Sequence, residues 1–157
     1  MNPGREKDFQ LPTLNLPPIN PAMKMEDGKV YIFDSLRKKH LILTPEEWVR
    51  QHWINFLIAH KGYPKGLFAL EKGMKYNKLS KRTDLVVFDR DGVPFLLIEC
   101  KAPEVQINEK TLAQAMSYNK EIKSPNIVLS NGLRHICFGY NKTKNTYEQL
   151  NDLPIIP

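Results

Sequence analysis

Two apolar segments joined by a tight turn constrain the fold of this chain more than any other feature. Residues 83–89 (TDLVVFD) and 94–101 (PFLLIECK) flank an Asp-Gly pair. This arrangement is typical of a β-hairpin. The three apolar residues before ECK predict a strand buried in the core. Because side chains alternate along a strand, Glu99 and Lys101 are expected on one face at its end.

The segments on either side predict further strands and two helices. Thr44 can cap a helix and Pro45 fits its first turn, while Gly62 ends the helical pattern. The expected elements are strands at 30–33 and 40–43, a helix at 44–61 with an apolar stripe of Val49, Trp53, Phe56, Leu57 and His60, strands at 67–76, 83–89 and 94–101, a helix at 108–122, and strands at 126–130 and 135–140.

The order of these elements from residue 44 is α, β, β, β, α, β, β. A helix separates strands 94–101 and 126–130, and if these strands pair in parallel the crossover is right-handed. The expected fold class is therefore α/β, a restriction-endonuclease-like core (αβββαβ order) with a mixed β-sheet flanked by helices, preceded by an N-terminal β-hairpin.

The first 23 residues differ in composition from the rest. Residues 1–23 carry five prolines and little periodicity, which predicts an extended arm outside the core. Residues 24–157 are expected to form a single domain, because a chain of 157 residues can bury one sizeable core.

Charge, cysteines and hydropathy limit the classes of function. The net charge of +6 favours an anionic partner, although an ordinary basic surface gives the same value. Cys100 and Cys137 lie in apolar runs and are expected to be buried thiols in a reducing compartment. No apolar run reaches the roughly 18 residues of a membrane span, and the first residues lack a signal-peptide core, so we expect a cytoplasmic protein with no membrane partner.

Asp84 and Glu99 indicate a metal site. If the chain folds back at the Asp-Gly turn, the start of one strand lies beside the end of the other, and the two carboxylates become neighbours with Lys101 close by. Such carboxylates repel each other unless a cation lies between them. Hard oxygen ligands with room for water suit Mg²⁺, which can activate a water and neutralise charge on a phosphate. Lys101 would add a further positive charge.

This pattern resembles the PD-(D/E)XK nuclease superfamily, whose motif is an acid on one strand and (D/E)xK on the next. Asp84 matches the first part and Glu99-Cys100-Lys101 the second, while Thr83 replaces the usual proline. The resemblance implies a Mg²⁺-dependent nuclease, in which Mn²⁺ can substitute. It also implies that the backbone carbonyl of Cys100 binds the metal.

A closer resemblance, over about residues 24–150, is to the N-terminal nuclease domain of type I restriction enzyme R subunits. It is carried by the ordered segments TPEEWVRQ, RTDLVVFD, ECKAP, QAMSYN and SNG. The family's first-helix glutamate maps to Glu47, and its QxxxY motif maps to Gln114 and Tyr118, which are expected to contact or shape the DNA-facing side. R subunits also carry a helicase motor. This sequence has no GxxxxGK[ST] loop, so we expect no ATP-driven translocation by it alone.

Each candidate residue also has a purely structural explanation. Glu47 can complete a T-x-x-E capping box with Thr44. Glu99 and Lys101 can form a surface ion pair, and Asp84 can cap a turn.

Basic residues precede Asp84. Lys81 and Arg82 are the last two residues of this basic run and are candidates for holding DNA phosphates near the metal. The alternative is that the run is a solvated basic loop. Glu71 is a rival acid to Glu47. For Gln114 and Tyr118, the alternative explanation is that they form a half-buried face of the helix and have no role in a site.

The expected function is a Mg²⁺-dependent DNA endonuclease of the R-subunit N-terminal type without the motor. Asp84 and Glu99 bind the metal, Lys101 assists the attacking water and Glu47 completes the acidic site. The alternative is a non-catalytic DNA-binding or complex-assembly module that retains the nuclease fold. The expected partners are DNA and other restriction-modification subunits, and because cutting both strands often needs two sites, a homodimer is a further candidate.

Overall fold

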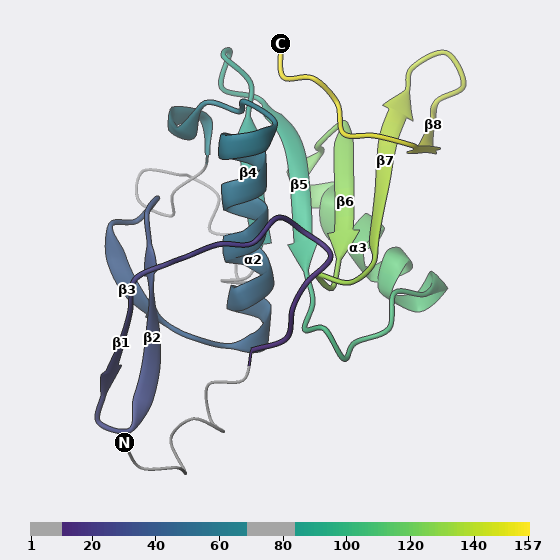
Figure 1. Cartoon of the computed structure of the whole chain (residues 1–157). Coiled ribbons are helices and arrows are strands. Elements are labelled where there is room, and N and C mark those ends of the chain that lie inside the picture. The colour runs from purple at the N-terminus through teal and green to yellow at the C-terminus, as the bar shows by residue number, and fades with distance from the viewer. Residues whose placement is uncertain (1–10, 69–83) are drawn as a thin grey trace.

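The computed structural model describes residues 11–68 and 84–157, which form two β-sheets and two α-helices (Figure 1). The strands are β1 (Met23–Glu26), β2 (Lys29–Asp34), β3 (Lys39–Ile42), β4 (Asp84–Phe88), β5 (Pro94–Cys100), β6 (Asn126–Ser130), β7 (His135–Asn141) and β8 (Thr146–Leu150). The helices are α2 (Pro45–Asn55), the π-helical turn η1 (Phe56–His60), the 3₁₀ turn η2 (Lys65–Leu67) and α3 (Glu109–Ile122). The sheets have the orders β1-β2-β3 and β4-β5-β6-β7-β8. The fold class is therefore mixed α/β.

The β4–β5 hairpin forms as the sequence predicts. Asp89 Oδ1 accepts hydrogen bonds from the amides of Asp91 (2.9 Å) and Val93 (3.0 Å) and so closes the turn. Gly92 has a φ of 77°, which glycine adopts without the steric cost of a Cβ. The two strands pair antiparallel along their length.

Helix α3 connects β5 to β6, and these two strands pair in parallel, as expected. A capping box begins the helix: the Thr111 amide donates to Asn108 Oδ1 (3.0 Å) and the Asn108 amide donates to Thr111 Oγ1 (2.9 Å). Lys123, with a φ of 60°, follows the last turn. The predicted helix at 108–122 is thus confirmed to within one residue.

The two helices cover opposite faces of the five-stranded sheet, with α2 in front and α3 behind in Figure 1. Side chains alternate along a strand, so neighbours in β4 and β5 contribute to different clusters. The face toward α2 contains Leu85, Val87, Leu96, Ile98 and Val128, packed with Val49 and Trp53. The face toward α3 contains Val86 and Leu97, packed with Ile122, and Leu129, packed with Ala115.

The first helix changes its winding before it ends. The Lys61 amide donates to the Phe56 carbonyl (3.1 Å), which is the i to i+5 spacing of a π-helix. Val49, Trp53 and Leu57 of the predicted stripe are buried, whereas His60 is exposed. The inclusion of His60 in the apolar stripe was wrong, because the wider turn rotates the last residues away from a 3.6-residue period.

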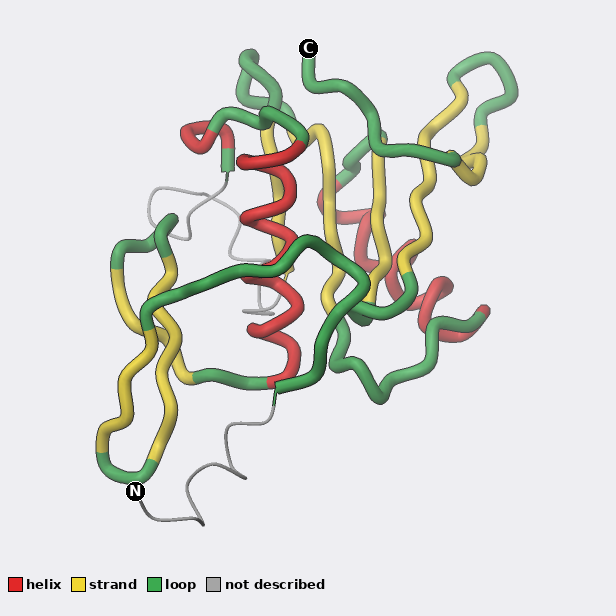
Figure 2. The backbone as a smooth tube through the Cα atoms, in the orientation of Figure 1, coloured by secondary structure: helices red, strands yellow, loops and turns green. Residues whose placement is uncertain are grey.

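The N-terminal arm differs from its expectation. Its described part, residues 11–22, is extended but crosses α2 and the β6–β7 turn (Figure 2). Leu14 is 7% exposed and belongs to the core cluster under α2. The Asn15 amide donates to the Gly132 carbonyl (2.8 Å), and His135 Nε2 lies 2.9 Å from the Asn15 carbonyl oxygen. The expectation that the arm lies outside the core was wrong for this segment, because a buried leucine and backbone hydrogen bonds fix it there.

The remaining predicted strands and the two cysteines are confirmed only in part. The hairpin of residues 30–33 and 40–43 is confirmed as β2 and β3, whereas β1 and β8 were not expected. The predicted strand 67–76 lies mostly outside the described residues, although residue 68 forms an isolated bridge with residue 87. Both cysteines are free thiols, and Cys100 is buried as expected while Cys137 is only half-buried.

Within residues 11–68 and 84–157, no helix is both long enough and apolar enough to span a membrane.

Candidate active site

Asp84 and Glu99 face each other across the β4–β5 pair. They are register partners in the antiparallel ladder, so their side chains lie on the same face of the sheet, with Cβ atoms about 5 Å apart. Asp84 is 7% exposed and Glu99 is 1% exposed. The hairpin thus brings two buried carboxylates together at the sheet edge where β5 ends, as the sequence predicted.

Lys101 supplies a positive charge to this pair. Its Nζ lies 3.0 Å from Glu99 Oε1, and its side chain is 20% exposed. Its amide donates to the Ser130 carbonyl (2.7 Å), so the backbone is still tied to β6 one residue beyond the end of β5. The ammonium group therefore stands at a fixed position between the buried carboxylate and solvent.

Tyr118 reaches the same site from α3. Burial raises the pKa of its hydroxyl, and the charge of Asp84 and a hydrogen bond to Asp84 raise that pKa further. Its ring packs on Val86 and Leu97 of the sheet. Gln114 lies one turn earlier on α3 and is exposed. The structure thus brings Tyr118 to Asp84 and leaves Gln114 at the surface.

Glu47 lies at the start of α2, on the other side of the sheet from α3. Its amide donates to Thr44 Oγ1 (3.0 Å), which is one half of a capping box. Its carboxylate does not supply the other half: Oε1 accepts from Arg50 Nη1 (2.9 Å) and Gln51 Nε2 (2.9 Å). The capping explanation therefore accounts for the Glu47 backbone and not for its side chain.

Asp34 and Arg50 were missed by the sequence reasoning. Arg50 is 1% exposed, and its Nη1 also donates to Asp34 Oδ2 (2.8 Å) on β2. Burial lowers the pKa of Arg50, but the charges of Glu47 and Asp34 outweigh it and raise that pKa. The signal in the sequence was the i, i+3 spacing of Glu47 and Arg50, which places an acid and a base on the same side of the helix.

Cys100 lies between the two groups of charges. Its side chain packs in the cluster under α2 and is 2% exposed. Burial raises the pKa of its thiol well above the usual range, Asp84, Glu47 and Glu99 raise it further, and Arg50 lowers it. The Cys100 side chain lies on the face of the sheet toward α2, opposite the face that carries Asp84 and Glu99.

The donor set fits Mg²⁺ by its chemistry. Across the part of the chain that the structure describes, no three or more His, Cys, Asp or Glu side chains are grouped so as to hold a metal ion. Asp84 and Glu99 therefore form a two-carboxylate site that Glu47 does not join directly. Mg²⁺ is usually bound by one or two carboxylates together with water and substrate phosphates, so two carboxylates are sufficient.

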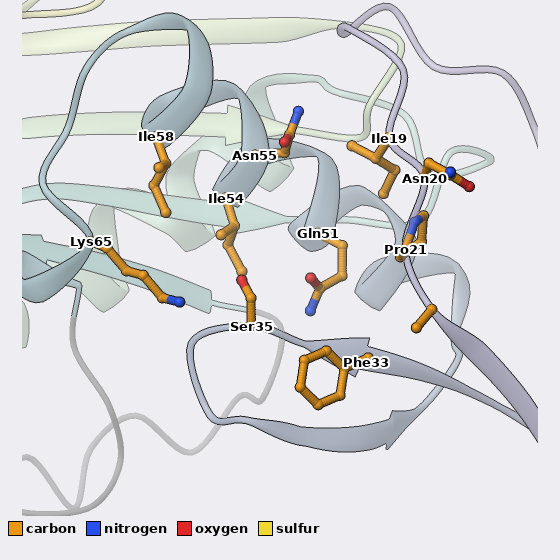
Figure 3. Close-up of a pocket in the computed structure, with 11 residues that line it drawn as sticks. Ile19, Asn20, Pro21, Phe33, Ser35, Gln51, Ile54, Asn55, Ile58 and Lys65 are labelled. Atoms are coloured by element: carbon orange, nitrogen blue, oxygen red, sulfur yellow. The ribbon is translucent and has the colours of Figure 1, made fainter.

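Two cavities formed by described residues lie away from this pair. One of about 400 Å³ opens between the arm, β2 and α2, and Gln51 and Ile54 point into it (Figure 3). Another of about 340 Å³ lies around Trp53 and His135. Neither cavity is lined by Asp84, Glu99 or Lys101.

Three predicted residues lie outside the described part of the chain. They are Lys81 and Arg82, the candidates for phosphate contacts, and Glu71.

The fold and the Asp84–Glu99 pair at the end of β5 define a mixed α/β domain with two neighbouring carboxylates. A family model for the Type I restriction enzyme R protein N terminus matches residues 45–154, and the chain belongs to that family. This confirms the family resemblance and places the chain among restriction-related, nuclease-type domains. The matched segment includes the five-stranded sheet and both α-helices, and the arm and the β1–β3 sheet precede it. Neither a curated protein nor a solved structure matches the chain.

Proposed function

We propose that this chain is a Mg²⁺-dependent DNA endonuclease domain of the PD-(D/E)XK type. The observation that carries the proposal is the register pairing of Asp84 with Glu99, both buried, with the Lys101 ammonium 3.0 Å from Glu99. Two neighbouring buried carboxylates favour a cation between them, and their hard oxygens favour Mg²⁺. Membership of the restriction family supports DNA as the substrate.

Each side chain of the proposed site has a separate role. Asp84 and Glu99 would hold the metal, with the backbone carbonyl of Cys100 as a further ligand. Mg²⁺, when bound, supplies an acidic water and neutralises charge on the scissile phosphate. Lys101 would position the attacking water or a phosphate oxygen, since its side chain reaches solvent. Tyr118 holds the Asp84 carboxylate in place through its hydroxyl.

Two further residues belong to the proposed site without contacting the metal. Glu47 adds negative charge at the end of β5. Gln114 is exposed on the helix that carries Tyr118, so it can contact DNA that lies across this edge. Other restriction-modification subunits and a second copy of the chain are the proposed protein partners, in the cytoplasm.

A cleavage assay tests the proposal. Purified chain is incubated with supercoiled and linear DNA in Mg²⁺, Mn²⁺ or EDTA, beside Asp84→Asn and Lys101→Met. We expect cutting with either metal, none in EDTA, and a loss of about 100-fold or more in both variants. The control is Asp152→Asn, which removes the charge of an exposed ion pair with Lys61, keeps an oxygen to accept from the Leu153 amide, and should cut like the original chain. Cutting that persists in Asp84→Asn would place the active site elsewhere.

A non-catalytic module is the second candidate function. It is favoured by the Lys101–Glu99 ion pair, which is also the way a structural lysine balances the charge of a buried carboxylate. DNA binding measured by fluorescence anisotropy, without cutting in any metal, would support a DNA-binding module. A chain that neither binds nor cuts DNA would support a role in complex assembly.

A further inference from the structure

The SNG segment, residues 130–132, lies where β5 and β6 end. Cys100 and Ser130 are the last register partners of these two parallel strands. Lys101 and Asn131 each follow that pair directly, and the Lys101 amide donates to the Ser130 carbonyl (2.7 Å). Asn131 is therefore the first residue of β6 beyond the point where backbone pairing supports the Lys101 segment.

Both ends of the Asn131 carboxamide form hydrogen bonds. Its Oδ1 accepts from the amides of Leu133 (2.9 Å) and Arg134 (2.8 Å), which closes the β6–β7 turn. Its Nδ2 donates to the Val105 carbonyl (2.8 Å) and lies 3.5 Å from the Pro103 carbonyl oxygen. The residue is 7% exposed, so water competes little for these bonds. The carboxamide thus links the β6–β7 turn to the loop that follows β5.

The loop after Lys101 begins with a closed turn. The Ala102 side chain is buried, at 3% exposed, and the Val105 amide donates to the Ala102 carbonyl (3.0 Å). Asn131 binds the carbonyl of the same Val105. Lys101 therefore lies between a strand end, where its own amide is bound to β6, and a turn that Asn131 holds in place.

We propose that Asn131 is a positioning residue for Lys101: by binding the turn of residues 102–105, it keeps the Lys101 ammonium in place beside Glu99. The inference rests on the proposed function, in which Lys101 assists the attacking water. Because pairing of β5 with β6 ends at Ser130, a side-chain amide replaces the strand as the support of the chain beyond that point. A displacement of about 1 Å can cost about 100-fold in rate, so looser support should cost about 10-fold.

Two substitutions remove the donated bond and keep an acceptor for the β6–β7 turn. Asn131→Asp has no N–H to donate, but it retains the oxygen that accepts from the amides of Leu133 and Arg134. Asn131→Ser also keeps an oxygen for the turn and adds no charge, and its shorter side chain does not reach the Val105 carbonyl. An effect common to both variants is therefore due to the lost bond and not to an added charge.

Asn141 offers a matched control at the other end of β7. Its Oδ1 also accepts from two amides in a turn, those of Thr143 (3.0 Å) and Lys144 (3.1 Å). Its Nδ2 also donates one bond, to Glu148 Oε2 (3.2 Å). Asn141→Ser thus removes the same kinds of contact away from Lys101.

Amide hydrogen exchange of the full chain, followed by NMR, tests the positioning without DNA. We expect the Lys101 amide to exchange about 10-fold faster in both Asn131 variants and at its original rate in Asn141→Ser, because exchange reports local opening. Amides in the middle of β5 should keep their rates. Unchanged exchange at Lys101 overturns the inference, and so does an equal increase along all of β5, which marks a loss of global stability.

The cleavage assay tests whether this position matters for the reaction. We expect kcat and kcat/KM to fall together by about 10-fold in both Asn131 variants, with KM unchanged, since the weakened interaction is one made in the transition state. Unchanged kcat, or an equal fall in Asn141→Ser, overturns the inference. If the original chain cuts DNA with neither metal, the proposed function fails, whereas exchange at Lys101 still decides whether Asn131 holds this segment.

Discussion

The carboxylate of Asp34 shows how a single buried charge can be kept ionised. Burial raises its pKa, but the charge of Arg50 and hydrogen bonds from Arg50, Leu36 and Arg37 outweigh burial and lower the pKa below its ordinary value of 3.8. A carboxyl group with a lowered folded-state pKa stabilises the fold above its unfolded pKa. That contribution is lost as the pH falls through the folded-state pKa.

We therefore predict that Asp34→Asn lowers the free energy of unfolding by about 2 kcal/mol at pH 7. Because a typical domain has about 5–15 kcal/mol of stability, the variant should remain folded. The difference between the two proteins should shrink as the pH falls below about 3.8, because Asp34 then takes up a proton in the unfolded chain before it does so in the folded one. Urea unfolding at several pH values measures this. If the difference in the free energy of unfolding stays constant down to acid pH, the charge of Asp34 does not stabilise the folded state.

Residues joined by a recognisable hairpin turn were easier to predict than residues on elements with no such signal between them. Asp84, Glu99 and Lys101 were predicted as neighbours because one hairpin turn fixes their register. Asp34 and Arg50 are 16 residues apart, on a strand and a helix whose relative placement no local pattern encodes. Long-range contacts of this kind depend on tertiary packing, which a single sequence does not show.

At the scale of elements, the β4–β5 turn depends on one backbone conformation. Gly92 has a φ of 77°, and an added Cβ there would meet no atom within 4 Å. The cost of Gly92→Ala is therefore conformational only, and we predict a loss of about 1 kcal/mol in the free energy of unfolding. Gly66→Ala is the matched control: it also has open space around it but no positive φ, so its effect should stay within about 0.5 kcal/mol. Equal effects in the two variants, measured by urea unfolding, would contradict the argument.

Elements with strong end signals were predicted well, and edge strands were not. The Asp-Gly turn predicted the hairpin, and the helix expected at 108–122 matches α3 to within one residue. β1 (MKME) is exposed at every position, and β8 (TYEQL) is only partly buried. Neither strand has the alternation of a half-buried strand or the apolar run of a central one. Each forms at the edge of a sheet by pairing with a neighbour, which is a property of the whole sheet.

At the scale of the whole molecule, residues 11–22 of the arm connect α2 with the β6–β7 turn. Leu14 packs under α2 and against Gly132 in the β6–β7 turn. Gly132 has a φ of 85°, and a Cβ there would lie 2.8 Å from Leu14 Cδ2 and 3.0 Å from Val49 Cγ2. The arm thus occupies the space that a larger residue at position 132 would need.

This packing predicts a coupling between two distant parts of the sequence. Leu14→Ala should cost about 3 kcal/mol, because it removes a buried leucine. Gly132→Ala should also cost about 3 kcal/mol, part from the positive φ and part from the contact with Leu14. With both changes, the shorter side chain relieves the contact but not the backbone strain, so the total loss should fall short of the sum by about 1 kcal/mol.

Urea unfolding of the two single variants and the double variant measures the coupling. The control pairs Leu14→Ala with Gly92→Ala, which lies beyond the opposite end of β5 and should give additive losses. Additive losses in the Leu14 and Gly132 pair as well would mean that the arm does not press on the β6–β7 turn in solution. A coupling found only in that pair would establish residues 11–22 as part of the folded core, which composition and proline content alone did not indicate.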